Sequence, residues 1–254
     1  MRNMSADIVS QTDQPFIYER DMRIASAYCG NSTETDVCHV MELMQDCFTE
    51  YLSLLHCDNI RLHREFRRYW VVMRAYCRFG TAAQWNETIH ARTSVIKRTP
   101  MIFETEIILT HLDGSLVADG VQQLCVLDMA EHKPCKLDFL PELTSFPCAA
   151  PLGEAHRFLR LVPPQVAPSY ETVIRATDVD SNGHMNNIAY VRAVLNAFSV
   201  KELRATPIVS LEMHYDGECF ENETLIVSRA DDEKKSCVIA RTEHGGATAF
   251  ILFS

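Results

Sequence analysis

One order of sequence patterns occurs twice in this chain, and it restricts the possible folds more than any other feature. In the first half, a strand-like run at residues 16–28 precedes a helix whose apolar residues recur every three or four positions. They are Val37, Met41, Met44, Phe48, Tyr51 and Leu55. Four runs rich in β-branched and aromatic residues follow, at 69–79, 87–96, 103–111 and 116–127. This pattern predicts one long helix and an antiparallel meander of strands.

The second half repeats this order. A strand-like run at residues 170–176 leads through a polar turn at 178–187 into a helix with one apolar face. The apolar residues of this face are Met185, Ile188, Val191, Leu195 and Phe198. β-rich runs then follow at 208–215, 224–229, 236–242 and 248–253. A repeated unit predicts an α+β protein whose two antiparallel sheets lie side by side. The alternative is that two α+β halves look alike without being a repeat.

Proline residues separate the two halves. Seven of the ten prolines fall between Pro134 and Pro168, and proline is poorly accepted in helix interiors and in central strands. We therefore expect a first domain at residues 1–132, a linker over the surface at 133–168, and a second domain at 169–254.

The bulk composition excludes several classes of function. The net charge of −10 over 254 residues disfavours general binding to nucleic acid or to an anionic membrane, because both need a basic surface. No apolar run approaches the roughly 20 residues of a membrane-spanning helix, and residues 1–7 lack the apolar core of a signal peptide. The ten cysteines include no C-x-x-C pair, which favours reduced thiols in a cytoplasmic protein.

The polar turn at residues 178–187 is the main candidate for chemistry. It reads Asp-Val-Asp-Ser-Asn-Gly-His-Met-Asn-Asn, so two carboxylates, three amides and an imidazole directly precede a helix. A helix N-terminus has unpaired N–H groups and a partial positive charge, which can stabilise developing negative charge. Such a turn can serve catalysis, bind a metal ion, or only cap the helix.

A calcium-binding loop is the metal alternative. Asp178, Asp180, Asn182 and Gly183 match the start of an EF-hand loop, including the glycine at its sixth position. However, the twelfth position, which should be a bidentate Glu, is Ala189, and a strand-like run rather than a helix precedes the loop. We therefore expect no metal site in this turn.

The spacing of the polar residues favours catalysis. Asp178, Asp180, Asn182 and His184 alternate along the chain, and alternate side chains share a face in an extended segment. Histidine is the side chain whose ordinary pKa lies near neutral pH, which suits proton transfer. The alternative is that the Asp and Asn side chains only bond to the local backbone, as helix caps do.

On these residues the chain resembles the acyl-acyl-carrier-protein (acyl-ACP) thioesterases of plants and bacteria. The catalytic turn of that family reads roughly Asp-Leu-Asp-x-Asn-x-His-x-Asn-Asn, which is similar to residues 178–187. A second family motif, Tyr-x-x-Glu-Cys, is similar to residues 215–219. Cys219 is then a neighbour of the site rather than a nucleophile. The resemblance implies a catalytic set of Asp180, Asn182, His184 and Glu218.

The resemblance extends to the first half of the chain, less closely. The sequence Trp-Val-Val-Met-Arg at residues 70–74 is similar to a Trp-Val-Leu-x-Arg strand of the family, which implies substrate binding by Trp70 and Arg74. The family has two tandem hotdog domains, each a long helix wrapped by an antiparallel sheet, and its N-terminal domain holds the acyl chain. Ordinary helix core is the alternative for the residues that would line this acyl slot. These residues are Met41, Met44 and Phe48.

One basic segment interrupts the acidic composition. It consists of Arg61, His63, Arg64, Arg67 and Arg68. Acyl carrier protein is acidic, so the resemblance implies that this segment docks the carrier protein. A surface that only balances charge is the alternative.

The resemblance implies one function in full. The protein would hydrolyse the thioester of fatty acyl-acyl carrier protein and release free fatty acid in fatty acid biosynthesis, without a metal or an organic cofactor. Its partner would be acyl carrier protein with a phosphopantetheine-linked acyl chain, and the chain could form a homodimer. The alternatives are hydrolysis of acyl-CoA and a module that binds acyl thioesters without catalysis. A dehydratase of this fold is not expected, because no His-x-x-x-x-Pro-Gly stretch is present.

Overall fold

A computed structural model of the chain describes residues 15–254, except 31, 141–142, 144–146, 154–155 and 161–162. Residues 1–7, which were considered for a signal peptide, lie outside the described residues. No helix in the described part of the chain has both the length and the apolarity that crossing a lipid bilayer requires.

The first half forms the elements that its periodicity predicts. Its elements are β1 (Ile17–Arg23), α1 (Val37–Leu54), α2 (Asn59–Arg61), β2 (Arg68–Phe79), β3 (Thr88–Arg98), β4 (Phe103–His111) and β5 (Leu116–Asp128). Asp36 starts α1, because its carboxylate accepts a hydrogen bond from the His39 N–H at 3.0 Å. The hairpin between β4 and β5 places Gly114 at a φ of 87°, a conformation that favours glycine. A π-helical turn at Leu62–Phe66 connects α2 to β2.

The second half repeats this order of elements. They are β7 (Pro168–Val173), α4 (Asn187–Leu195), α5 (Val200–Ala205), β8 (Ile208–Tyr215), β9 (Thr224–Asp232), β10 (Lys235–Arg241) and β11 (Gly246–Phe253). Asn186 starts α4, because its side-chain oxygen accepts the Ile188 N–H at 2.7 Å. The apolar pattern does not predict the short helix α5. None of the side chains of α5 is buried in the core.

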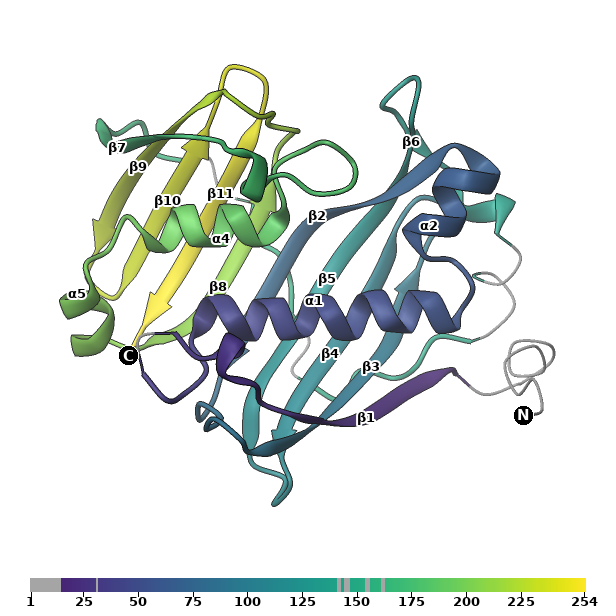
Figure 1. The fold of residues 1–254 in the computed structure, drawn as a ribbon, viewed down its shortest axis with the longest axis horizontal. Helices are drawn as coiled ribbons and strands as arrows, with labels where there is room; N and C mark the ends of the chain where they lie inside the picture. The colour runs from purple at the N-terminus through teal and green to yellow at the C-terminus, as the bar shows by residue number, and fades with distance from the viewer. Residues whose placement is uncertain (1–14, 31, 141–142, 144–146, 154–155, 161–162) are drawn as a thin grey trace.

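One large antiparallel sheet combines the strands of both halves. In the described residues its order is β1-β3-β4-β5-β2-β8-β11-β10-β9-β7, and β6 (Pro134–Cys135) pairs with β5. The halves join where β2 pairs with β8, with Cys77 opposite Leu211. Figure 1 shows α1 and α4 lying across the same face of this sheet. The structure is therefore a wide antiparallel sheet with few helices, and the two halves lie side by side as expected.

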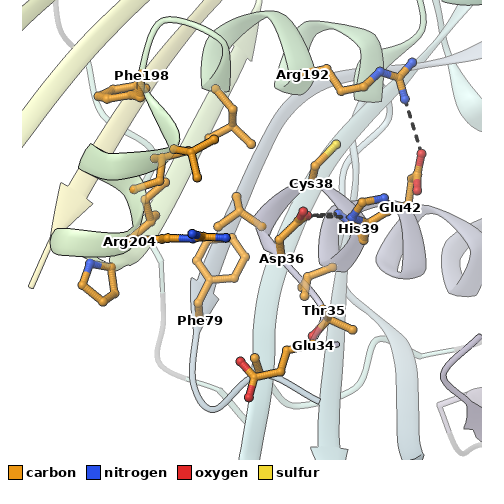
Figure 2. A pocket seen from close by; sticks show the side chains of 18 of the residues that line it. Glu34, Thr35, Asp36, Cys38, His39, Glu42, Phe79, Arg192, Phe198 and Arg204 are labelled. Carbon is orange, nitrogen blue, oxygen red and sulfur yellow. Dashed lines mark hydrogen bonds and ion pairs between the residues drawn. The ribbon is translucent and has the colours of Figure 1, made fainter. Parts of the chain in front are cut away.

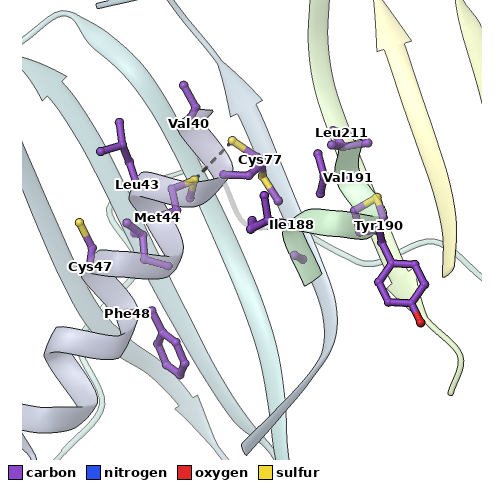
Figure 3. Packing of buried hydrophobic residues seen from close by; sticks show 14 of the residues in the cluster. Val40, Leu43, Met44, Cys47, Phe48, Cys77, Ile188, Tyr190, Val191 and Leu211 are labelled. Atoms are coloured by element: carbon purple, nitrogen blue, oxygen red, sulfur yellow. Dashed lines mark hydrogen bonds between the residues drawn. The ribbon is translucent and has the colours of Figure 1, made fainter. Parts of the chain in front are cut away.

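The hydrophobic core lies between the helices and the sheet. Leu43 and Met44 of α1 and Val191 of α4 are almost fully buried, and Figure 3 shows them facing the strands at the junction of the halves. The Cys77 thiol of β2 donates a hydrogen bond to the Met44 sulfur at 3.5 Å. Burial of each such side chain stabilises the fold by roughly 1.5–3 kcal/mol. All ten cysteines lie in the described part of the chain, as free thiols.

The proline-rich segment crosses the face of the sheet opposite the helices. Its His156 ring stacks on Tyr76 of β2, with the ring centroids 3.6 Å apart. Neighbouring residues of a strand face opposite sides, and Cys77 contacts α1. Tyr76 and the segment that it holds therefore lie on the outer face.

Two buried carboxylates anchor this segment to the sheet. Glu106 of β4 accepts hydrogen bonds from the N–H groups of Leu152 and Gly153 at 3.0 and 2.8 Å. Glu212 of β8 accepts the N–H of Leu159 at 2.8 Å and lies 2.7 Å from the His156 Nε2. These contacts satisfy charges that would be costly to bury alone.

Candidate functional site

The polar residues before α4 form a tight turn. The Gly183 N–H donates to the Asp180 carbonyl oxygen at 3.0 Å, and the Asp180 N–H donates to the His184 carbonyl oxygen at 2.9 Å. Gly183 has a φ of 84°, in the left-handed region that favours glycine. The expectation of an extended segment is therefore wrong, because the turn, and not strand-like alternation, sets the directions of these side chains.

The acidic side chains of the turn bond to backbone nearby. Asp178 Oδ2 accepts the Arg175 N–H at 2.9 Å, and Asp180 Oδ1 accepts the Asn182 N–H at 2.8 Å. These bonds are the local capping that the sequence left as an alternative. The Asn182 Oδ1, in contrast, is buried without a hydrogen-bond partner among the described residues. Buried acceptors normally have a partner, so this oxygen is an exception within the turn.

His184 and Glu218 meet beside this turn. His184 Nδ1 lies 3.2 Å from Glu218 Oε1. Tyr69 donates a hydrogen bond to the same carboxylate oxygen at 2.7 Å. His132 Nδ1 lies 3.3 Å from Glu218 Oε2 and 3.2 Å from the Tyr69 hydroxyl. Three side chains thus surround one carboxylate.

Tyr69 and His132 are missing from the set predicted from sequence, and both come from the first half of the chain. Tyr69 lies in β2, and the β2–β5 pairing places it opposite Leu127. His132 follows β5, and its N–H bonds to the Asp128 carbonyl oxygen at 2.9 Å. Tyr69 directly precedes Trp70, which the sequence pattern placed in a motif strand. This neighbourhood is a weak sequence signal for Tyr69. The sequence pattern contains no comparable signal for His132.

The cluster is partly shielded from solvent. The side chains of His184 and Glu218 are 14% and 23% exposed, and that of His132 is 53% exposed. The Phe220 ring lies edge-on to His184, with centroids 5.2 Å apart. Burial, reinforced by the hydrogen bond to Glu218, raises the pKa of Tyr69. The phenol therefore stays protonated and acts as a donor to the carboxylate.

A cavity of about 550 Å³ opens beside the turn. The first half of the chain supplies its apolar side chains together with polar ones such as Gln45, Glu50 and Asp58, and the turn and the start of α4 supply further polar groups. The apolar wall includes Phe48, Leu52, Trp70, Val72 and Leu124. The polar end includes Asp180, Ser181, Asn182, Asn186 and Asn187. This cavity suits a molecule that has an apolar part and a polar part.

Two of the predicted substrate-binding residues line this cavity. They are Phe48 and Trp70, and the Trp70 indole N–H is fixed by a hydrogen bond to the Cys57 carbonyl oxygen at 2.7 Å. Met41 and Met44 are instead buried in the core between α1 and the sheet, away from the residues that line this cavity. Their position matches the helix-core alternative.

Arg74 faces away from the cavity. The register of β2 against β5 shifts between Val72 and Arg74, and such a bulge reverses the alternation of side chains along a strand. Val72 lines the cavity, whereas the Arg74 guanidinium lies 6.0 Å from the ring of Phe158 in the proline-rich segment. The position of Arg74 does not support the predicted contact with substrate.

The basic segment directly precedes β2 and so lies close to the cluster along the chain. Arg61 forms an ion pair within its own turn at 2.9 Å, and the Arg68 guanidinium lies 3.9 Å from the centre of an aromatic ring. Arg64 and Arg67 are exposed. His63 is half-buried and has a buried Nε2. Two of the predicted docking arginines are therefore engaged in contacts, and two face solvent.

A second cavity of about 600 Å³ lies at the N-terminus of α1. Figure 2 shows Asp36, His39 and Glu42 on one side of it and Arg192 and Phe198 on the other. The His39 ring contacts the Asp36 carboxylate at 2.7 Å, so this acid–imidazole pair belongs to the helix cap. These two cavities thus lie at the starts of the two main helices.

One group of side chains has the composition of a metal site. His132, His184 and Glu218 each place one possible ligand atom within 4.8 Å of the others, and they are the one such group among the described residues. Asp178 and Asp180, which would begin a calcium loop, bond to backbone N–H groups instead.

Comparisons with known proteins give a family and a fold. Residues 164–247 match the family model of the acyl-ACP thioesterase C-terminal domain. A comparison with curated proteins gives no match. An acyl-ACP thioesterase from Bacteroides thetaiotaomicron superimposes with a TM-score of 0.84 at 16% identity, over 94% of this chain and 98% of that one. A putative oleoyl thioesterase from Lactobacillus plantarum gives 0.79 at 15%, over 94% and 96%.

A plant structure is also similar. The 12:0-ACP thioesterase from Umbellularia californica superimposes with a TM-score of 0.79 at 14% identity, over 94% of this chain and 97% of that one. At such identities these structures establish the fold, and the family match rests on the sequence of the second half, which contains the turn and Glu218. Residues 164–247 thus match the acyl-ACP thioesterase C-terminal domain family, and the chain has the fold of acyl-ACP thioesterases.

Proposed function

We propose that the protein hydrolyses the thioester bond between a fatty acyl group and acyl carrier protein. The observation that carries this proposal is the Glu218 carboxylate, which lies 3.2 Å from His184 and accepts a hydrogen bond from Tyr69. A positioned carboxylate beside an imidazole can take a proton from water and pass it on. The match of residues 164–247 to a thioesterase family supports the same chemistry.

In the proposed reaction, Glu218 takes a proton from a water molecule as the water oxygen attacks the thioester carbonyl carbon. The carbonyl oxygen becomes an oxyanion, which the positive end of α4 stabilises from Asn187 at the polar end of the cavity. The C–S bond then breaks, and the proton passes from Glu218 through His184 to the leaving sulfur. The products are a free carboxylic acid and a thiol.

The remaining polar groups position the reactants. Tyr69 holds the Glu218 carboxylate in one orientation through its hydrogen bond. Asp180 holds Asn182 in its turn, and Asn182, which lines the cavity, orients the phosphopantetheine arm.

We also propose that each half of the chain is a hotdog domain, in a protein of the cytoplasm. Residues 1–132 would form the first domain and residues 169–254 the second, with the linker at 133–168. The repeated order of one main helix and a meander supports this division. Because the apolar wall of the cavity comes from the first half, that domain is proposed to hold the acyl chain and the second to supply the acid and imidazole.

The test compares wild-type protein with Glu218→Gln on acyl-ACP and acyl-CoA substrates of equal chain length. We expect kcat to fall by about 10²–10⁴-fold on both substrates, because the variant cannot accept the proton. Asp180→Asn, which keeps the size of the side chain, is expected to have a smaller effect. A kcat equal to that of wild type in Glu218→Gln would contradict the proposed mechanism. Binding of acyl thioesters by a wild-type protein without turnover would favour the non-catalytic alternative.

The exposed part of the basic segment is proposed as the docking site for the acidic carrier protein. Arg64→Glu with Arg67→Glu should raise KM for acyl-ACP several-fold, because the electrostatic attraction is reversed. KM for acyl-CoA should change less, which separates docking from catalysis. An equal effect on both substrates would contradict a role in binding the carrier protein.

A further inference from the structure

We propose that His132, His184 and Glu218 form a binding site for a divalent transition-metal ion, with Zn²⁺ as the best fit, and that an ion bound there blocks the enzyme. The binding part of this proposal rests on geometry alone. The inhibitory part rests also on the proposed function, in which Glu218 and His184 move the proton.

The distances within the cluster match those of a zinc site. In tetrahedral coordination with bonds of about 2.0–2.1 Å, two ligand atoms lie roughly 3.3 Å apart. The Nδ1 atoms of His184 and His132 lie 3.2 and 3.3 Å from the Glu218 carboxylate oxygens. One ligand atom from each of the three residues lies within 4.8 Å of the other two. A single ion can therefore reach all three with small side-chain rotations.

These two separations are longer than those of the histidine–carboxylate pairs that hydrogen-bond directly in the same molecule, although His244 and Glu243 are farther apart at 3.9 Å. Five pairs that hydrogen-bond directly have N–O distances of 2.5–2.8 Å. They are His39–Asp36, His90–Asp21, His156–Glu212, His214–Glu212 and His244–Glu223. Charge-assisted hydrogen bonds have short distances of this kind. The wider spacing around Glu218 leaves room for an ion between the ligand atoms.

The ligand types select the class of metal. Two imidazoles and one carboxylate suit Zn²⁺ and neighbouring transition metals, whereas Ca²⁺ and Mg²⁺ prefer oxygen ligands throughout. The hydrogen bond from Tyr69 to Glu218 Oε1 would fix the carboxylate from the outer shell of the site. His132 is half-exposed, so an ion can enter and leave from the solvent side.

An ion at this position occupies the groups that the proposed reaction needs. Coordination uses the lone pair of the His184 Nδ1 and one oxygen of the Glu218 carboxylate, and the bound cation lowers the basicity of the other oxygen, so neither group serves as a base for water. His132 is the third ligand and comes from the other half of the chain, which lets one substitution test the metal site while leaving Glu218 and His184 in place.

The binding test uses Co²⁺ as a spectroscopic probe on the full chain. We expect one Co²⁺ per molecule with visible absorption bands but without the thiolate charge-transfer band that a cysteine ligand would produce. His132→Gln should weaken Co²⁺ binding by at least about 10-fold, and Zn²⁺ should displace the Co²⁺. His90→Gln, a matched change at an exposed histidine that pairs with Asp21, should bind as wild type does. Thermal unfolding of both variants verifies that they are folded.

The outcomes separate the two parts of the proposal. Equal Co²⁺ affinity in wild type and His132→Gln, or a strong thiolate band, would overturn the site. Thioester hydrolysis should fall as Zn²⁺ is added and return with a chelator, at a lower Zn²⁺ concentration in wild type than in His132→Gln. Stimulation by Zn²⁺ would overturn the inhibitory role. A chain that binds Co²⁺ at this site but hydrolyses no acyl thioester in chelator would retain the site and refute the proposed function.

Discussion

The starts of α1 and α4 share one backbone framework, but only the second carries the cluster around Glu218. Before α1, the Thr35 N–H donates to the Ala83 carbonyl oxygen at 2.9 Å. Before α4, the Met185 N–H donates to the Cys219 carbonyl oxygen at 2.8 Å. In each case the next residue caps the helix with its side chain. The described residues of the two regions therefore share this hydrogen bond and this form of capping.

These hydrogen bonds align the two halves residue by residue, and the alignment shows what the first half lacks. The corresponding residues are His184 and Glu34, Glu218 and Ala82, and Asp180 and Gly30. At Gly30 a Cβ atom would collide with the Asp36 carboxylate. A side chain at the position of Asp180 would therefore require the Asp36 carboxylate, which caps α1, to move.

The two regions also have cavities of similar size, about 600 Å³ at α1 and about 550 Å³ at α4. Figure 2 labels some of the side chains around the first cavity. Among the residues that line it, Ala82 occupies the position that corresponds to Glu218. The two helix starts thus share backbone hydrogen bonds and a neighbouring cavity, and they differ in the side chains beside them. Four predictions test this comparison, in order of expected effect.

The largest effect is expected at the imidazole and its counterpart. His184→Ala should lower kcat for acyl thioester hydrolysis by about 10²–10⁴-fold, because the proton relay is removed. Glu34→Ala, at the corresponding position before α1, should leave kcat unchanged. Steady-state kinetics of the two purified variants make the comparison. A comparable loss in Glu34→Ala would mean that both hollows take part in the reaction.

The second prediction concerns Glu212, which anchors the proline-rich segment on the outer face of the sheet. Burial would raise the pKa of Glu212, but hydrogen bonds from His156, His214 and the Leu159 N–H outweigh it and lower the pKa from 4.5 to about 2. A depressed carboxyl pKa contributes stability above pH 4.5 that is lost as the pH falls towards 2, here about 3 kcal/mol. Urea unfolding at pH 7 and pH 3 should detect about 2 kcal/mol of this contribution, because at pH 3 the carboxyl group is still mostly ionised in the folded protein.

Glu212→Gln should lose most of that pH dependence, because the variant side chain does not ionise. Glu106→Gln, at the anchor in the first half, serves as the matched control for the removal of a buried carboxylate. An unchanged difference in unfolding free energy between pH 7 and pH 3 in Glu212→Gln would show that other groups cause it.

A smaller effect is expected at Tyr69, which links the first half to the cluster. Tyr69→Phe removes the hydrogen bond to Glu218 and should lower kcat by about 10-fold, since hydrogen bonds to charged groups contribute about 1.5–3 kcal/mol. A positioning role should also move the pH profile of kcat and leave KM nearly unchanged. Tyr76→Phe, on the same strand but on the outer face, is the control. Equal kinetics in the two variants would argue against a role for the phenol.

The smallest effect is expected at the two helix caps. Asp36→Ala and Asn186→Ala should each lower the free energy of unfolding by about 1 kcal/mol, because each removes the acceptor of a helix N-terminal N–H. Only Asn186→Ala should also lower kcat, because Asn186 lines the cavity at α4. Denaturant unfolding and kinetics on the same preparations compare them. Loss of activity in both variants at equal stability would contradict the assignment of function to one hollow.

The local elements followed from the sequence because local forces determine them. The apolar spacing from Val37 to Leu55 predicts α1, and the bounds of β4 and β8 agree with the predicted runs at 103–111 and 208–215. Arg74 shows the limit of this reasoning. Period-two alternation places it on the face of Trp70 and Val72, but a bulge reverses the strand. Such an irregularity depends on pairing with another strand and leaves no mark in a single sequence.

The sequence by itself determined the repeated order of helix and strands, the turn at 178–187 and the presence of His184 and Glu218, because periodicity, capping and motif spacing are properties of short segments. Only the tertiary structure decided that Tyr69 and His132 join Glu218. Their approach requires β2 to pair with β5 and the two halves to meet. Contacts between residues so far apart in the chain depend on the whole packed sheet.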